Sequence, residues 1–167
     1  KFLYRCIMKS QIILCSGGAR SGKSEFAERL ALATEGRKAY VATGQAFDDE
    51  MVDRIKKHQE RRGNIWTNFE IPLYLAEEWQ HISSVADVIL IDCLTMFTTN
   101  HMMAHGSIQG QQDANRLEDT VLSELEALLN LIKVSDDKIV IFVTNEIGLG
   151  IVPDNKLARY FRDIAGR

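Results

Sequence analysis

Short apolar runs alternate with longer amphipathic segments along this chain. The runs are β-branched and nearly unbroken, and they lie at 11–15, 39–42, 87–91 and 138–143. Such runs are typical of strands that are buried on both faces, as in a parallel sheet. Segments with helical spacing lie at 24–35, 48–62, 73–82 and about 112–133. The alternation predicts an α/β fold in which helices flank a mostly parallel central sheet.

Two of the helical segments show which face is expected to be buried. In the segment 112–133 one apolar stripe faces acidic residues on the other side, which indicates core packing and no site. The stripe consists of Leu117, Val121, Leu125, Leu128, Leu129 and Ile132. In the segment 24–35 the spacing predicts that Phe26, Ala27, Leu30 and Ala31 face inward, and that Glu25, Glu28 and Arg29 face outward.

Length and composition narrow the choice of protein class. The chain has 167 residues, of which 46% are hydrophobic, and this fits one domain over 1–167. The net charge of −3 gives no indication of the basic surface that nucleic-acid binding requires. No apolar run approaches the ~18 residues of a membrane span.

The ends and the cysteines also carry information. Residues 1–8 are too short for a signal peptide and are expected to be a non-native or disordered leader, with Met8 as a candidate native start. Cys6, Cys15 and Cys93 form no C-x-x-C pair, so they are expected to be reduced, packed thiols in a cytoplasmic protein.

A phosphate-loop motif follows the first apolar run. It reads Gly17-Gly18-Ala19-Arg20-Ser21-Gly22-Lys23-Ser24. A strand, a glycine-rich turn and a helix in this order make backbone N–H groups converge on a phosphate at the positive end of the helix. Lys23 can neutralise the β and γ phosphates, and the Ser24 hydroxyl can bind Mg²⁺. The motif predicts nucleotide binding but does not define a reaction.

Polar residues follow three other predicted strands. They are Thr43, Gly44 and Gln45 after the second run, Asp92 after the third, and Thr144, Asn145 and Glu146 after the fourth. In a parallel α/β sheet ligands bind beyond the carboxyl ends of the strands. Asp92 is therefore a candidate carboxylate for Mg²⁺, with a simple turn cap as the alternative. Glu146 competes for the same role or serves the loop.

Histidines are the remaining candidates for chemistry. His58 shares a helical side with Arg54, Arg61 and Arg62, which favour a neutral, nucleophilic imidazole and can hold phosphates. A solvated or packed histidine is the simpler interpretation of that pattern alone. His101 and His105 lie four residues apart, but they lack the Glu of H-E-x-x-H and a third ligand, so zinc is disfavoured.

Further blocks give the chain a family resemblance. In order, they are the phosphate loop, Tyr40-Val41-Ala42-Thr43, Asp49-Glu50-Met51 with Arg54-Ile55-x-x-His58, Asp92-Cys93-Leu94-Thr95 with Asn100, and Val143 to Pro153 with Arg162-Asp163 and Gly166. Together they resemble the bifunctional adenosylcobinamide kinase / adenosylcobinamide-phosphate guanylyltransferase family. The resemblance implies a RecA-like P-loop fold, and a homo-oligomer, with a trimer as one form. It also implies that a C-terminal helix and last strand of the family are missing after Arg167.

The resemblance also implies the reactions and the site. ATP or GTP would phosphorylate the corrinoid adenosylcobinamide, and GTP would then donate GMP to the product through a guanylyl-histidine at His58. Contacts to GTP or its Mg²⁺ would come from Thr43, Gly44, Gln45, Gln59, Glu60, Arg61, Arg62, Glu70 and Asp92. A carboxylate such as Glu70 suits the N1–H and N2 amino group of guanine.

Two other functions remain compatible with the residues. One is a P-loop small-molecule kinase without guanylyl transfer. The other is a GTP-binding module in which the nucleotide is a ligand and not a reactant.

Overall fold

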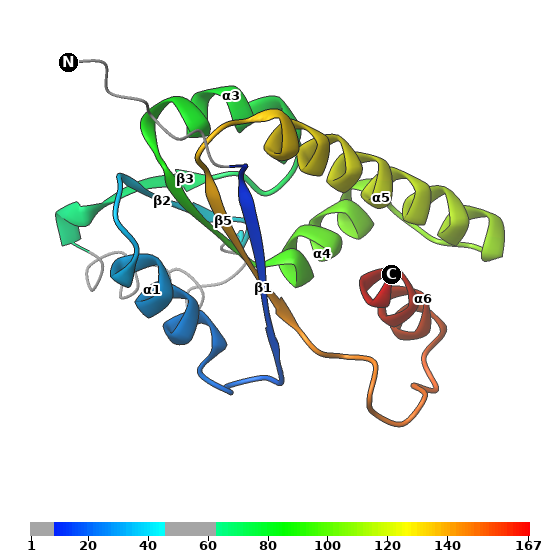
Figure 1. Ribbon diagram of the computed structural model, residues 1–167. Helices are drawn as coiled ribbons and strands as arrows, with labels where there is room; N and C mark the ends of the chain where they lie inside the picture. Colours follow the sequence, from blue (N-terminus) through cyan, green and yellow to red (C-terminus); the bar gives the residue numbers. More distant parts are fainter. Residues whose placement is uncertain (1–8, 46–62) are drawn as a thin grey trace, which may run out of the picture.

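A parallel sheet forms the centre of the molecule (Figure 1). The computed structural model describes residues 9–45 and 63–167, and in these ranges the sheet has five strands. In chain order they are β1 (Gln11–Gly17), β2 (Lys38–Ala42), β3 (Trp66–Glu70), β4 (Val88–Asp92) and β5 (Ile139–Asn145). Their order across the sheet is β1-β5-β4-β2-β3, and all neighbours are parallel. The α/β prediction is confirmed, and each predicted apolar run overlaps a strand, with Asp87 and Lys138 just before β4 and β5.

Helices cover the sheet on both sides. They are α1 (Lys23–Ala33), α3 (Leu75–Val85), α4 (Leu94–His105), α5 (Gln111–Val134) and α6 (Lys156–Gly166), with a short 3-10 helix η1 (Gly63–Ile65) before β3. The helix predicted at 48–62 lies outside the described residues. None of the helices within 9–45 and 63–167 is long and apolar enough to cross a membrane.

Two helices, α4 and α6, have no counterpart among the predicted helical segments. In α4, the buried side chains cover more than half of the circumference of the helix, and most of them are polar; they are Thr95, Phe97, Thr98, Asn100 and His101. A helix covered on several sides has no continuous polar face, so its sequence lacks the amphipathic period that reveals helices such as α5. In α5 the predicted stripe is confirmed, because Leu117, Val121, Leu128 and Ile132 are buried.

Alternate residues of the three central strands β2, β4 and β5 build two separate cores. Val41, Ile89, Ile91, Val140 and Phe142 belong to the core under α3, α4, α5 and α6. The residues between them, such as Leu90 and Ile141, belong to the core under α1. Since successive side chains of a strand point to opposite faces, strands with both faces covered must be apolar throughout.

The inward face of α1 differs from the predicted one. Ala27 and Ala31 are fully buried and Glu28 is also buried, whereas Phe26 is 53% exposed. The prediction for Phe26 and Glu28 was therefore wrong. Small residues at 27 and 31 let the helix approach the sheet closely, so the line through the two alanines, and not the bulkiest side chain, forms the contact.

An ion pair fastens the amino-terminal ends of the strands. The Arg37 guanidinium donates to both carboxylate oxygens of Asp87, at 3.0 Å each, and Lys138 Nζ lies 3.5 Å from Oδ1. The backbone N–H of Arg37 also donates to Asp87, at 3.0 Å. The hydrogen bonds from Arg37 hold the pKa of Asp87 well below its ordinary value, against the opposing effect of partial burial. The pair thus joins the segments that lead into β2, β4 and β5.

The lowered pKa of Asp87 predicts a pH-dependent contribution to stability. The ionised form is favoured in the folded state, so the contribution is complete above the ordinary carboxyl pKa and disappears as pH falls through the lower folded value. We expect Asp87→Asn to destabilise the protein at pH 7, and the difference from wild type to shrink by pH 3. Urea unfolding at both pH values measures this, with Asp119→Asn at an exposed position of α5 as the control. An equal deficit at both pH values would contradict the prediction.

Candidate functional site

The phosphate loop has the backbone that its sequence requires. It connects β1 to α1, and the N–H of Phe26 donates to the carbonyl of Gly22 at 2.9 Å, which begins the helix. Gly22 has a φ of 83°, in the left-handed region that favours glycine. A Cβ on Gly17 would lie 2.8 Å from Ser21 Oγ, so the side chain of Ser21 would have to shift.

The side chains of the loop face solvent or a partly open space. Gly18, Ala19, Arg20 and Ser21 are exposed, and Lys23 and Ser24 are half-buried. Lys23 Nζ donates to the carbonyl of Gly18 at 3.2 Å, so the ammonium folds back over the loop. An anion at this point would meet a positive charge and the N-terminus of α1 together.

The last residue of β5 and the turn after it lie against the phosphate loop. Gly17 pairs with Asn145, and the N–H of Glu146 donates to the carbonyl of Gly17 at 2.9 Å. Glu146 Oε1 accepts from the N–H groups of Gly148 and Leu149 at 2.6 and 3.0 Å. These bonds support the loop-structure interpretation of Glu146 over a metal role.

Asp92 lies at the carboxyl end of β4, as predicted. Its Oδ2 accepts a hydrogen bond of 2.9 Å from the hydroxyl of Tyr40 on β2. The N-cap position of α4 is Cys93 and not Asp92, so capping this helix does not account for the carboxylate. Tyr40 escaped the sequence analysis because a tyrosine inside an apolar strand has the pattern of a core residue.

The turn after β2 is tightly held. Thr43 is fully buried, and its hydroxyl donates to the carbonyl of Cys93 at 2.7 Å and accepts from the N–H of Cys93 at 2.8 Å. Gly44 and Gln45 follow it at the same end of the sheet. Glu70, the last residue of β3, is exposed and pairs with Ala42 of β2. The structure therefore brings Thr43 to Gln45, Glu70 and Asp92 to one end of the sheet, the end that carries the phosphate loop.

The structure does not describe the segment that contains the predicted nucleophile, His58. His58, Gln59, Glu60, Arg61 and Arg62 all lie outside the described residues. Their roles stay predictions from the sequence.

The disfavoured zinc site finds no support. His101 is buried, with Nε2 3.2 Å from Glu124 Oε2, while His105 is exposed. Within residues 9–45 and 63–167 no three His, Cys, Asp or Glu side chains are grouped so that they could hold a metal ion. Cys15 and Cys93 are free and buried, as expected, and burial raises the pKa of both thiols.

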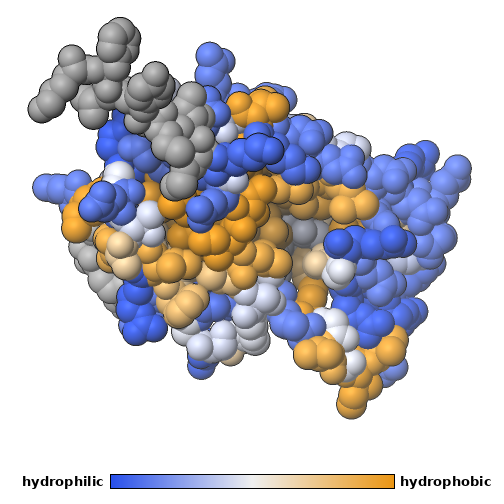
Figure 2. All heavy atoms as spheres, viewed as in Figure 1, coloured by the Kyte–Doolittle hydropathy of each residue, from blue (hydrophilic) through white to orange (hydrophobic). Residues whose placement is uncertain are grey.

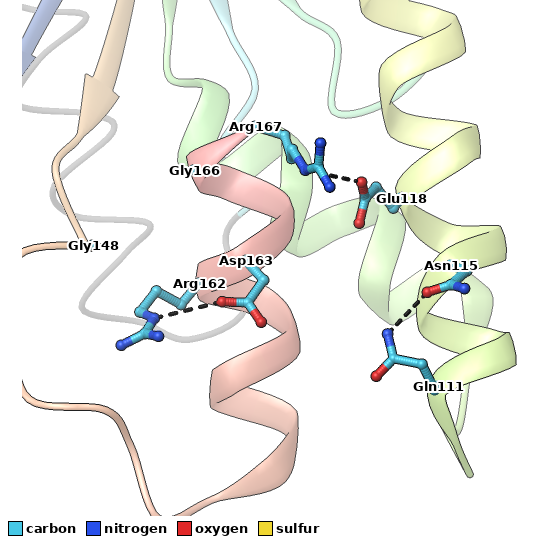
Figure 3. Close-up of a pocket in the computed structure, with 8 residues that line it drawn as sticks. All are labelled: Gln111, Asn115, Glu118, Gly148, Arg162, Asp163, Gly166 and Arg167. Atoms are coloured by element: carbon cyan, nitrogen blue, oxygen red, sulfur yellow. Dashed lines mark hydrogen bonds and ion pairs between the residues drawn. The ribbon is translucent and has the colours of Figure 1, made fainter.

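A separate pocket of about 540 Å³ lies between α5, α6 and the loop after β5 (Figure 3). An ion pair of 3.2 Å between Arg167 and Glu118 crosses it. Its lining residues are Gln111, Asn115, Glu118, Gly148, Arg162, Asp163, Gly166 and Arg167. Among the described residues, none of those predicted to bind nucleotide lines this pocket.

Comparison with known proteins identifies the family. The family model described as cobinamide kinase / cobinamide phosphate guanyltransferase matches residues 13–167. This chain belongs to that family. The match includes the phosphate loop, Asp92 and the segment that follows β5, and the resemblance inferred from the sequence blocks is confirmed.

Curated members of the family are similar to this chain along most of their length. The bifunctional adenosylcobalamin biosynthesis protein CobU of Escherichia coli is 38% identical over 165 residues, covering 93% of this chain and 86% of the relative. The protein of the same name from Salmonella typhimurium is 40% identical with the same coverage. The bifunctional adenosylcobalamin biosynthesis protein CobP of Pseudomonas aeruginosa is 40% identical, covering 92% of this chain and 82% of the relative.

The position of Lys23 predicts the effect of its removal. Lys23→Ala is expected to weaken binding of GTP by about 10- to 100-fold, since a charge-assisted contact to phosphate is lost. Titration with a fluorescent GTP analogue measures the change. Lys133→Ala, at an exposed position in the last turn of α5, is the control and should bind as wild type. Wild-type affinity in Lys23→Ala would contradict the assignment of the loop.

Proposed function

We propose that this protein acts twice on a corrinoid in cobalamin assembly. It first transfers the γ-phosphoryl group of ATP or GTP to the hydroxyl of adenosylcobinamide, and then transfers GMP from GTP to the resulting phosphate. The observation that carries the proposal is the phosphate loop at the carboxyl end of a parallel sheet, in a chain whose family match runs from residue 13 to residue 167. The proposed enzyme is cytoplasmic. The proposed homo-oligomer stays a prediction.

The kinase step needs positioning and charge neutralisation more than covalent chemistry. The N–H groups of the loop and the Lys23 ammonium would hold the β and γ phosphates while the substrate hydroxyl attacks the γ phosphorus. The bond from the γ phosphorus to the bridging oxygen breaks, the nucleoside diphosphate leaves, and the hydroxyl proton is released. Arg20 and Ser21, which are exposed at the tip of the loop, would face the second substrate.

Ser24 and Asp92 fit a magnesium ion by their chemistry. A hydroxyl and a carboxylate are hard oxygen donors, and the bond from Tyr40 to Oδ2 orients the carboxylate of Asp92. When bound, Mg²⁺ would neutralise charge on the phosphate oxygens.

The guanylyl step would use His58 as a covalent nucleophile. An imidazole nitrogen attacks the α phosphorus of GTP, a nitrogen–phosphorus bond forms, and pyrophosphate leaves. A phosphate oxygen of adenosylcobinamide phosphate then attacks the same phosphorus and releases the histidine. Arg61 and Arg62 would hold phosphate oxygens during both displacements. Support for this step comes from the sequence block Arg54-Ile55-x-x-His58.

Preference for guanine would come from Glu70. Its carboxylate is exposed at the end of β3, beside the turn that carries Gly44 and Gln45. A carboxylate can accept both the N1–H and the N2 amino hydrogens of guanine, a pair that adenine does not present.

Labelled GTP separates this function from its alternatives. The protein is incubated with adenosylcobinamide and with GTP labelled at the α or the γ phosphate, and is then denatured. The α label is expected to stay on the wild-type protein in an acid-labile, alkali-stable bond, and the γ label is expected on the corrinoid. His58→Ala should lose the α label and keep the γ transfer. His105→Ala, at an exposed position of α4, is the matched control and should keep both. Transfer of γ label alone in the wild type would show a kinase without guanylyl transfer, and transfer of neither label would show a GTP-binding module.

The bond from Tyr40 to Asp92 predicts an effect on the Mg²⁺ requirement. Tyr40→Phe removes the hydroxyl but keeps the ring contact with Trp66. The Mg²⁺ concentration for half-maximal kinase activity should rise about fivefold, the effect of one lost hydrogen bond. Kinase assays over a Mg²⁺ series measure it. Tyr160→Phe, on α6, should behave as wild type, and an unchanged requirement in Tyr40→Phe would refute the role of Tyr40.

A further inference from the structure

A buried amide on α4 connects the turns that follow two different strands. Asn100 is 3% exposed, and its Nδ2 donates to the carbonyl of Thr43 at 2.7 Å and to the carbonyl of Pro72 at 3.0 Å. Thr43 follows β2, and Pro72 follows β3 by two residues. One side chain thereby sets the spacing of two turns at the end of the sheet that carries the phosphate loop.

The orientation of this amide follows from its partners. Both contacts are carbonyl oxygens, so a flipped amide would place its own oxygen against two acceptors. The other amide atom, Oδ1, makes no hydrogen bond with any residue of the described ranges. Burying an amide is unfavourable unless its groups are paired. The two donated bonds are therefore what Asn100 contributes here, beyond filling space.

Each of the two turns also has anchors of its own. The hydroxyl of Thr43 is bonded to Cys93, and the N–H of Ile71 donates to the carbonyl of Ala42 at 2.9 Å. The N–H of Leu75, at the start of α3, donates to Glu124 Oε1 at 2.6 Å. These bonds attach each turn to a neighbouring element, whereas Asn100 bonds to both turns at once.

The two turns flank the proposed guanine contacts. Gly44 and Gln45 come directly after Thr43, and Glu70 comes two residues before Pro72. Resting on the proposed function, we infer that Asn100 is a positioning residue that holds the β2 and β3 turns at the spacing needed for the guanine base. Because Asn100 is buried, its proposed role is to position other residues and not to contact the nucleotide. Asn100 acts through the position of Glu70 and of the turn at Thr43.

A double-mutant cycle on GTP binding tests the inference. Asn100→Ala is expected to weaken GTP binding about tenfold, since the base contact is misplaced. In a Glu70→Ala background the same change should have little further effect, because the contact that Asn100 positions is already absent. ATP binding should change much less than GTP binding, because adenine does not present the pair of N–H groups that the Glu70 carboxylate would accept. The control Asn115→Ala, at an exposed position of α5, should bind GTP as wild type.

Hydrogen exchange provides a readout that does not depend on binding. In Asn100→Ala the amides of residues 43–45, 71 and 73–75 should exchange faster, while those of β1 and α1 stay as in wild type. A uniform rise across the sheet would show a general loss of stability and would overturn the positioning role. If Asn100→Ala does not fold, Asn100→Ser retains a hydroxyl donor in a smaller volume and enters the same measurements.

The outcomes separate this inference from the proposed function. Effects of Asn100→Ala and Glu70→Ala that multiply independently, or equal losses for GTP and ATP, would overturn the inference while GTP binding by the wild type upheld the function. A wild-type protein without affinity for GTP would refute the proposed function and the inference together.

Discussion

The in-register parallel ladder is the constraint on which the rest of the structure depends. β4 lies between β2 and β5, so that Asp92 is level with Ala42 on one side and Val143 on the other. Because every strand runs the same way, every polar residue that follows a strand emerges at one end of the sheet. The phosphate loop, Asp92 and Glu70 lie at the same end of the sheet for this reason, although they are far apart in the sequence. The opposite end carries the Arg37–Asp87 pair, which joins segments and contributes nothing to the site.

The two faces of the sheet serve different purposes. α1 packs closely through Ala27 and Ala31 and fixes where the phosphate loop ends. The other face is covered by α3, α4 and α5, and from it Asn100 of α4 reaches the turns after β2 and β3. Apolar surface remains exposed on β1, at Ile12 and Leu14, and on the loop after β5, at Leu149 and Ile151, and Figure 2 shows orange atoms over both regions. The site is thus supported from both layers, while apolar surface stays uncovered at β1 and in the loop after β5.

Much of the fold and part of the site were predictable from local sequence. The β-branched runs identified four strands because strands with two buried faces admit few polar residues, and the stripe of α5 identified the longest helix. The phosphate loop was predictable because its glycines have local causes: a φ of 83° at Gly22, and at Gly17 the close approach of Ser21 Oγ to the position of a Cβ. α4 was missed because burial on several sides removes the amphipathic pattern, and Glu28 was misplaced because the depth of a helix face depends on how closely the helix approaches the sheet.

The sequence by itself determined the layered α/β architecture, the phosphate loop and the family, because each rests on the order and spacing of residues along the chain. Only the tertiary structure decided which polar side chains support the site. Tyr40 and Asp92 are 52 residues apart in sequence, and Asn100 is 57 residues from Thr43. Hydrogen bonds across such separations depend on strand order and helix packing, and neither leaves a periodic signal in the residues that form them.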